Sequence, residues 1–130
     1  MADRIFELQQ ALYAAVAAAL SPMKVFDYVP ENPALPYAVI DFLSTTPWGG
    51  KGSMGQEHEI EVACYHGGEQ RGKKAAQQKL SLVIAALHDV ALNIANQSEP
   101  ARGIYLGTSF DVSEDGKIVR GAATFRYFTQ

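Results

Sequence analysis

The sequence predicts an α+β fold, in which a mostly antiparallel sheet of four to five strands packs against two helices in the order α-β-β-β-α-β-β. Two segments repeat apolar residues at three- and four-residue steps, as amphipathic helices do. Other segments alternate apolar and polar residues or carry β-branched runs, which is typical of strands. With 130 residues, no internal repeat and no long linker, the chain is expected to form one domain over residues 1–130.

Residues 3–20 are predicted to form the first helix. Asp3 stands where an N-cap belongs, and Ser21-Pro22 ends the segment. One apolar stripe should face the core, and it consists of Ile5, Leu8, Leu12, Val16 and Ala19. A second apolar stripe consists of Phe6, Tyr13, Ala17 and Leu20. Two explanations stay open for the second stripe: a neighbouring subunit covers it, or the helix packs on a curved sheet.

Two or three strands are expected before the second helix. Residues 24–29 form a short candidate, and three prolines then hold an extended connection to a strand at residues 37–45. Residues 47–55 are expected to be a flexible loop, because four of these nine residues are Gly. Residues 56–66 alternate most clearly. Their apolar face carries His58, Ile60, Val62, Cys64 and His66, and their acidic face carries Glu57, Glu59 and Glu61.

A long second helix and a closing hairpin complete the predicted fold. The helix is expected over residues 69–94, with a buried stripe formed by Ala76, Leu80, Val83, Leu87, Val90 and Ile94. Asp115-Gly116 is a favoured two-residue hairpin turn. That turn pairs Val112 with Val119, Leu106 with Phe125, Ile104 with Tyr127 and Asp111 with Arg120. A two-residue slip keeps the same facing and stays an alternative.

The amino-acid composition excludes some classes of function but does not identify one. The chain carries 11 Lys and Arg against 14 Asp and Glu, which argues against a broad basic surface that binds nucleic acid. A single cysteine, Cys64, allows no internal disulfide, and the sequence holds no apolar run long enough to cross a membrane. The glycine-rich stretch lacks the Gly-Lys-Ser/Thr order of a phosphate-binding loop.

One constellation could carry chemistry. His58, Cys64 and His66 share a strand face and could contribute to a zinc site, with a fourth ligand such as His88. Their spacing matches no zinc motif, and a buried structural thiol explains Cys64 without a metal. The sequence also lacks a nucleophile elbow and a dinucleotide fingerprint. We therefore expect no catalytic, cofactor-binding or metal-binding residues and no enzyme activity, with a small metal-binding protein or enzyme as the less favoured alternative.

Contacts between subunits or with other proteins have better candidates. The first helix offers Phe6 and Tyr13, and the glycine-rich stretch offers Trp48 and Met54 as apolar handles. A basic group near the start of the second helix could face the acidic strand, although a solvated helix face explains it more simply; the group contains Arg71, Lys73, Lys74 and Lys79. The predicted interface residues are Trp48, Lys51, Met54, Phe6, Tyr13, Glu57, Glu59, Arg71 and Lys74.

The ordered series of segments resembles the phage tail-terminator, or tail-completion, proteins of long-tailed phages, prophages and gene-transfer agents. The resemblance covers nearly the whole chain in order. It is carried by residues 11–15 (ALYAA), 25–30 (VFDYVP), 35–40 (LPYAVI), 55–58 (GQEH), 85–89 (AALHD) and 121–126 (GAATFR).

The resemblance implies a structural role in a virion. Proteins of this family are expected to form a ring, expected to be a hexamer, on the head-proximal end of the tail tube, where they stop tube polymerisation and dock to the head connector. DNA passes through the lumen without specific recognition. The implied partners are copies of the chain, the tail tube protein and a head-closure protein, with no cofactor and no membrane. The protein would be made in the host cytoplasm and reside in the neck of the virion. Another neck component, a head-closure or adaptor protein, is the main alternative.

Overall fold

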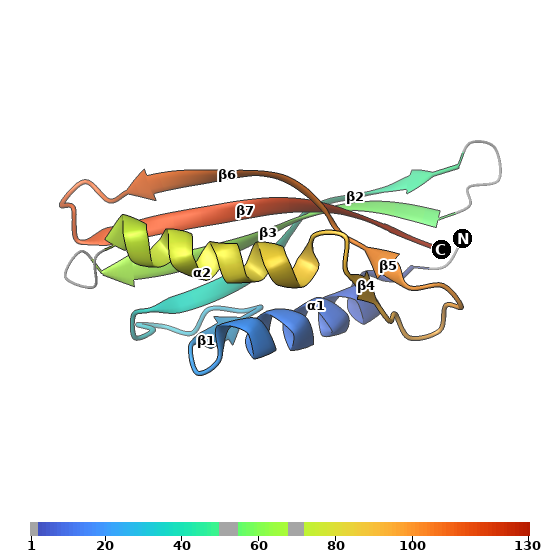
Figure 1. Cartoon of the computed structure of the whole chain (residues 1–130), viewed down its shortest axis with the longest axis horizontal. Coiled ribbons are helices and arrows are strands. Elements are labelled where there is room, and N and C mark those ends of the chain that lie inside the picture. Colours follow the sequence, from blue (N-terminus) through green and yellow to red (C-terminus); the bar gives the residue numbers. More distant parts are fainter. Residues whose placement is uncertain (1–2, 50–54, 68–71) are drawn as a thin grey trace.

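The computed structural model describes residues 3–49, 55–67 and 72–130, and it has the predicted α+β architecture (Figure 1). Two helices, α1 (Ile5–Leu20) and α2 (Gly72–Leu87), accompany a five-stranded sheet of order β1-β2-β3-β7-β6. Its strands are β1 (Lys24–Phe26), β2 (Tyr37–Trp48), β3 (Gly55–Gly67), β6 (Ile104–Val112) and β7 (Ile118–Thr129). Strand β1 runs parallel to β2, and the other neighbours are antiparallel. A small second sheet pairs β4 (Ala91–Leu92) with β5 (Ala101–Arg102).

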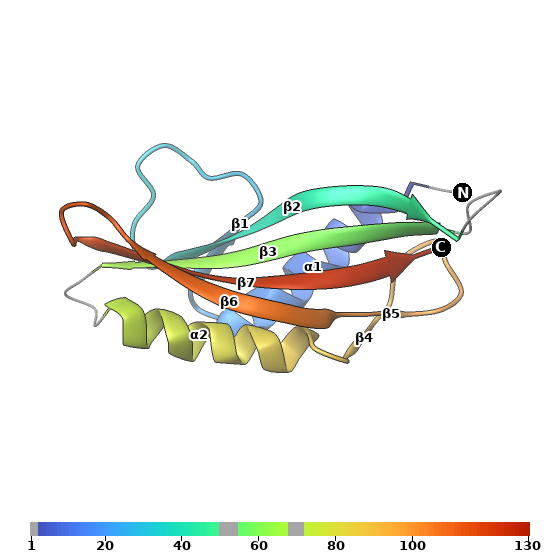
Figure 2. The ribbon, with the colours of Figure 1, turned by 90° about the horizontal axis from the view of Figure 1, so that it is seen from above.

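Both helices lie on the same face of the large sheet (Figure 2). The core fills the space between them, because one stripe of each helix meets the apolar positions of β3 and β7. Its largest fully buried side chains include Tyr127, Phe125, Leu8, Leu12, Ile60 and Leu80. We call this side of the sheet the covered face, and the side turned away from α1 and α2 the open face.

The first helix follows its sequence pattern closely. It begins at Ile5, and its N-cap residue is Arg4 rather than the predicted Asp3, although the backbone N–H of Ile5 donates to Asp3 Oδ1 at 3.1 Å. Its buried residues are Leu8, Leu12, Val16 and Leu20. Leu20 therefore belongs to the core, whereas Phe6 and Tyr13 of the second stripe are exposed.

The second helix is shorter than predicted. It ends at Leu87, and Asp89 adopts a left-handed conformation with φ 55°, which the helix cannot continue through. Val90 is therefore exposed, while Ile94 reaches the core from the segment after the helix. Apolar residues continue at helical spacing past Leu87, although the backbone is no longer helical there. The start predicted at residue 69 lies outside the described residues.

Two predicted boundaries in the first half of the sheet are wrong. Strand β1 ends at Phe26 rather than at residue 29, and β2 extends to Trp48. Cross-strand pairing explains the longer β2: Pro47 lies opposite Gln56, and Trp48 lies opposite Gly55. These ends of the supposed loop are therefore strand, because a partner strand is in place for them. The residues between, 50–54, lie outside the described residues.

The closing hairpin has the predicted register over most of its length. Val112 lies opposite Val119 and Asp111 opposite Arg120. A bulge between Tyr105 and Gly107 then shifts the pairing, so Tyr105 meets Phe125 and Ile104 meets Arg126. The extra residue turns Tyr105 toward the core and leaves Ile104 and Leu106 exposed. The predicted pairs of Ile104 with Tyr127 and of Leu106 with Phe125 are therefore wrong.

Candidate interaction surfaces

The open face of the sheet is acidic. On β2, β3, β6 and β7 it carries five carboxylates and two guanidinium groups, as the strand registers place them. The carboxylates belong to Asp41, Glu57, Glu59, Glu61 and Asp111, and the guanidinium groups to Arg120 and Arg126. Because strand residues alternate between faces, these groups share one side and the apolar residues between them share the other.

Two ion pairs cross from β3 to β7 on this face. Glu61 contacts Arg120, whose Nε also donates to Tyr65 Oη at 2.9 Å. The side chains of Glu61 and Arg120 are mostly buried, and hydrogen bonds to Tyr65 and Glu61 raise the pKa of Arg120 against the lowering effect of burial. Glu57 contacts Arg126 at 3.2 Å between Oε1 and Nε, and this pair is more exposed.

These pairs contradict the less favoured alternative, in which the basic start of the second helix faces the acidic strand. Helix α2 packs on the covered face, whereas Glu57, Glu59 and Glu61 point to the open face. Lys74 is exposed on α2, and the Lys73 ammonium lies 5.3 Å from the centre of the Phe110 ring. Arg71 lies outside the described residues. Asp111 stands opposite Arg120 as predicted, but the Arg120 guanidinium contacts Glu61 instead.

A groove runs between α1 and β1. It has a volume of about 770 Å³, and its walls include Phe6, Tyr13, Met23 and Phe26. Phe6 is 67% exposed and Tyr13 is 44% exposed, which is high for large apolar side chains. The two residues predicted from the second stripe of the helix therefore lie together in one groove, whose walls also include the polar side chains of Gln9 and Asp27.

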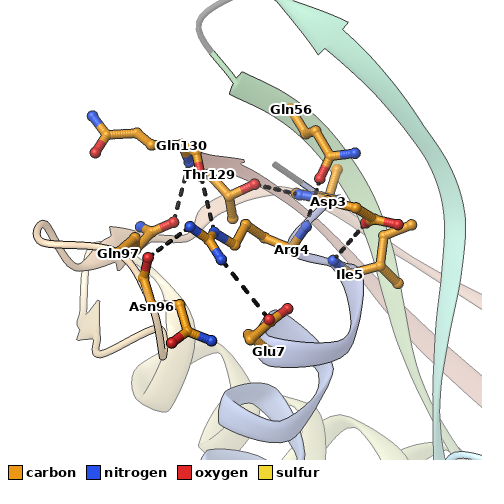
Figure 3. Close-up of polar contacts among 10 residues, drawn as sticks. Asp3, Arg4, Ile5, Glu7, Gln56, Asn96, Gln97, Thr129 and Gln130 are labelled. Atoms are coloured by element: carbon orange, nitrogen blue, oxygen red, sulfur yellow. Dashed lines mark hydrogen bonds and ion pairs between the residues drawn. The ribbon is translucent and has the colours of Figure 1, made fainter. Parts of the chain in front are cut away.

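The start of α1, the start of β3 and the end of β7 meet at one end of the molecule (Figure 3). Arg4 joins them, because its backbone N–H donates to Gln56 Oε1 at 2.9 Å and its Nε donates to the Gln130 carbonyl at 3.1 Å. Its Nη2 donates to the Asn96 carbonyl at 2.6 Å. The sequence gives no signal for this cluster, since its members are far apart along the chain.

Trp48 belongs to the same end of the sheet. Its ring meets the Phe128 ring edge-on at 5.6 Å between centroids, and its Nε1 donates to the Thr129 carbonyl at 3.3 Å. Trp48 is half-buried and Phe128 is 38% exposed. Trp48 is thus a fixed part of the hairpin rather than a loose handle. The other predicted handle of this segment, Met54, and the predicted interface residue Lys51 lie outside the described residues.

His58, Cys64 and His66 are buried on the covered face and have a structural role there. His58 is fully buried, and its ring nitrogens hydrogen-bond Thr45 Oγ1 at 2.9 Å and Thr129 Oγ1 at 2.8 Å. Burial raises the pKa of Cys64 to about 12, which keeps the thiol protonated. His66 is buried as well, and its Nδ1 has no hydrogen-bond partner within the described parts of the chain.

No group of three or more His, Cys, Asp and Glu residues in the described ranges is arranged to hold a metal ion. His58, Cys64 and His66 share a face, as predicted, but the core occupies the space in front of it. Within the same ranges, neither helix is both long and apolar enough to cross a membrane.

Comparison with solved structures shows where this fold occurs. The virion of a native gene transfer agent particle contains a chain that superposes with a TM-score of 0.72 and 20% sequence identity. The match covers 93% of this chain and 92% of that chain, and at this identity it shows a shared fold. No curated protein matches the sequence significantly.

The family comparison is more specific. The family model described as "Tail completion protein gp17" matches residues 7–130, which is nearly the whole chain. The match agrees with the resemblance of the sequence segments. The chain therefore belongs to the tail completion protein family and is a structural protein of a phage-type tail or neck.

Proposed function

We propose that the protein forms a ring on the head-proximal end of the tail tube, where it stops tube polymerisation and presents the surface to which the head connector docks. The observation that carries this proposal is the family match over residues 7–130. The expected ring is a hexamer, its partners are the tube protein and a head-closure protein, and its place is the neck of the virion.

The surfaces of the chain support a ring. Subunits of a ring contact each other through two different, complementary patches, because the contact is head-to-tail. The groove at Phe6 and Tyr13, whose walls are partly apolar and partly polar, lies beside α1, away from the charged open face of the sheet. The groove is therefore one candidate patch for a contact with another chain, and it leaves the charged open face for the channel.

The open face suits the lining of a DNA channel. Its carboxylates outnumber its guanidinium groups, and both guanidinium groups are held by Glu61 and Glu57. Binding of DNA depends on free cations that neutralise phosphates and release counterions. A lumen lined by this face would therefore repel the phosphate backbone and let DNA pass without retaining it.

Electron microscopy of particles from a strain that lacks the gene tests the role directly. We expect tails of irregular, excessive length that carry no head, because nothing ends the tube. Restoring the wild-type gene should restore uniform tails. Complete tails of normal length beside heads that leak DNA would instead identify a head-closure or adaptor protein and contradict termination. Normal particles would contradict both roles.

A further inference from the structure

We infer that neighbouring copies join edge to edge, with β6 of one copy adding as an antiparallel strand to the outer edge of β2 of the next. This inference deepens the proposed ring and rests on it. It names the contact by which one copy binds the next, and it makes the sheet continuous from copy to copy.

The first observation is that β6 forms an unusually open edge. It pairs with β7 on one side, and along residues 106–112 no other backbone partner occurs among the described residues. The strand contains no Lys, Arg or Pro, and its only charge is Asp111. Soluble proteins commonly protect such edges with lysine, proline or a covering element, because unpaired backbone groups recruit another strand.

The second observation is an open stretch at the opposite edge of the same sheet. Strand β1 has only three residues and pairs with Tyr37, Ala38 and Val39 of β2. Beyond them, along residues 40–46, the outer side of β2 has no backbone partner among the described residues, and this stretch ends at Pro47, which has no N–H to donate. The chain thus carries two different free edges, one on each side of its sheet, as a head-to-tail contact needs.

Strand direction makes the two edges compatible. Strands β2, β3, β7 and β6 are antiparallel in succession, so β6 runs opposite to β2. Copies related by rotation about an axis along the strands keep their strand directions. The β6 edge of one copy therefore meets the β2 edge of the next in antiparallel orientation. The helices of all copies then lie on one side of the continued sheet, and the acidic open faces lie on the other.

Exposed apolar side chains accompany both edges. The bulge of β2 carries Leu43, which is 47% exposed, and the bulge of β6 carries Leu106, which is 41% exposed. At the end of β6, Val112 is 59% exposed, on the end of the sheet where the α1–β1 groove of the next copy would lie. Main-chain pairing would bury these side chains together with the backbone groups.

Three lysine substitutions of matched exposure test the contact. Leu106→Lys places a charge on the β6 edge, Leu43→Lys places one on the β2 edge, and Leu82→Lys changes a side chain of α2 that is also 47% exposed. Ring formation on purified tail tubes, counted by electron microscopy, should fall at least about tenfold for each edge variant, since about 1.4 kcal/mol per contact gives that factor. Leu82→Lys should form rings like the wild type.

Mixing the two edge variants tests that the contact is head-to-tail. The Leu106→Lys chain keeps an intact β2 edge, and the Leu43→Lys chain keeps an intact β6 edge. Their mixture should form dimers through the one intact pair of edges, measured by sedimentation velocity, whereas each variant alone stays monomeric. Normal rings from Leu43→Lys alone would overturn the β6–β2 contact, because they would show that β6 pairs elsewhere.

Proline substitutions on neighbouring residues provide a second, stricter test. Backbone N–H groups of adjacent strand residues point to opposite sides, so only one of Thr108→Pro and Ser109→Pro removes an N–H that faces β7. The variant that keeps the wild-type melting temperature should lose rings. If that variant and both lysine variants still form normal rings, the edge contact is wrong while the ring stands. A wild-type protein that forms no ring on tube ends contradicts the ring itself.

Discussion

The two faces of β3 show how one strand serves two purposes. The covered face buries His58, Cys64 and His66, whereas the open face carries three glutamates, of which Glu57 and Glu61 form ion pairs with arginines of β7. The helices cover the face that carries the apolar residues of the strand and leave the acidic face open. Polar groups of the covered face therefore serve stability, and polar groups of the open face remain available for assembly. The comparison warns that a row of His and Cys residues on one strand does not by itself indicate a metal site.

Substitutions of aromatic residues on β7 should show the largest difference in the free energy of unfolding between the two faces. Phe125 lies on the covered face and is fully buried, and Phe128 lies on the open face. Phe125→Ala should lower the free energy of unfolding by about 3–5 kcal/mol, because it leaves a cavity in the core. Phe128→Ala should cost about 1 kcal/mol. Urea unfolding measures both, and equal losses would break the distinction between the faces.

His58 offers a smaller effect on the covered face. His58→Leu fills the site of the imidazole with an apolar side chain. It removes the hydrogen-bond partner of the Thr45 and Thr129 hydroxyls. We expect a loss of about 1–3 kcal/mol in urea unfolding, the cost of leaving a buried polar group unpaired. The matched change Thr45→Val in the His58→Leu background should recover part of that loss. No recovery would show that the hydrogen bond contributes little.

The covered face should also make stability depend on pH. Burial lowers the pKa of His58 and of His66 below the ordinary value of 6.5; Asp3 partly opposes this at His58, and Lys79 adds to it at His66. Below pH 6.5 these histidines bind protons in the unfolded chain, whereas in the folded chain they stay neutral until the pH reaches their lowered pKa values. Stability is therefore full above that pH and is lost as the pH falls through the lowered pKa values. Urea unfolding across this range measures the slope, which the double variant His58→Gln, His66→Gln should flatten.

Trp48 tests the boundary between folding and assembly. Trp48→Ala removes the contact with Phe128 and the hydrogen bond to Thr129, and we expect a loss of about 1–2 kcal/mol. Ring formation should fall more than this loss explains, since Trp48 stands at the end of the open face. Melting temperature and ring counts, measured with Phe128→Ala as the comparison, separate the two effects. Loss of both in proportion would place Trp48 in the core alone.

The ion pairs should give the smallest effects on stability. Glu61→Gln should cost about 1 kcal/mol, because Glu61 and Arg120 are mostly buried and share Tyr65. Glu57→Gln should cost at most about 0.5 kcal/mol, because its pair with Arg126 is more exposed. Urea unfolding in low and high salt checks both values. The reverse order would show that burial does not rank these pairs.

Local patterns predicted much of the fold. The alternation in residues 56–66 placed its residues correctly, and the turn signal near Asp115 placed Asp111 opposite Arg120. The stripe of the first helix identified Leu8, Leu12 and Val16 as core but missed Leu20. The candidate surface was only partly predictable. Phe6 and Tyr13 stood out as a second apolar stripe, but Arg120 and Arg126 could not be recognised as partners of the glutamates. Their contact requires β7 to lie beside β3, and the two strands are separated along the chain by a helix and three strands.

The sequence by itself determined which residues prefer helix or strand and which side of each element is apolar, because periods of 3.6 and 2 residues are local properties of the backbone. Only the tertiary structure decided where α2 ends, where β2 and β6 bulge, and which guanidinium groups meet the acidic strand. These features depend on contacts between segments distant in sequence, and a local period carries no information about its distant partner. The two free edges of the sheet belong to the same class, since an edge exists only once the strand order is set.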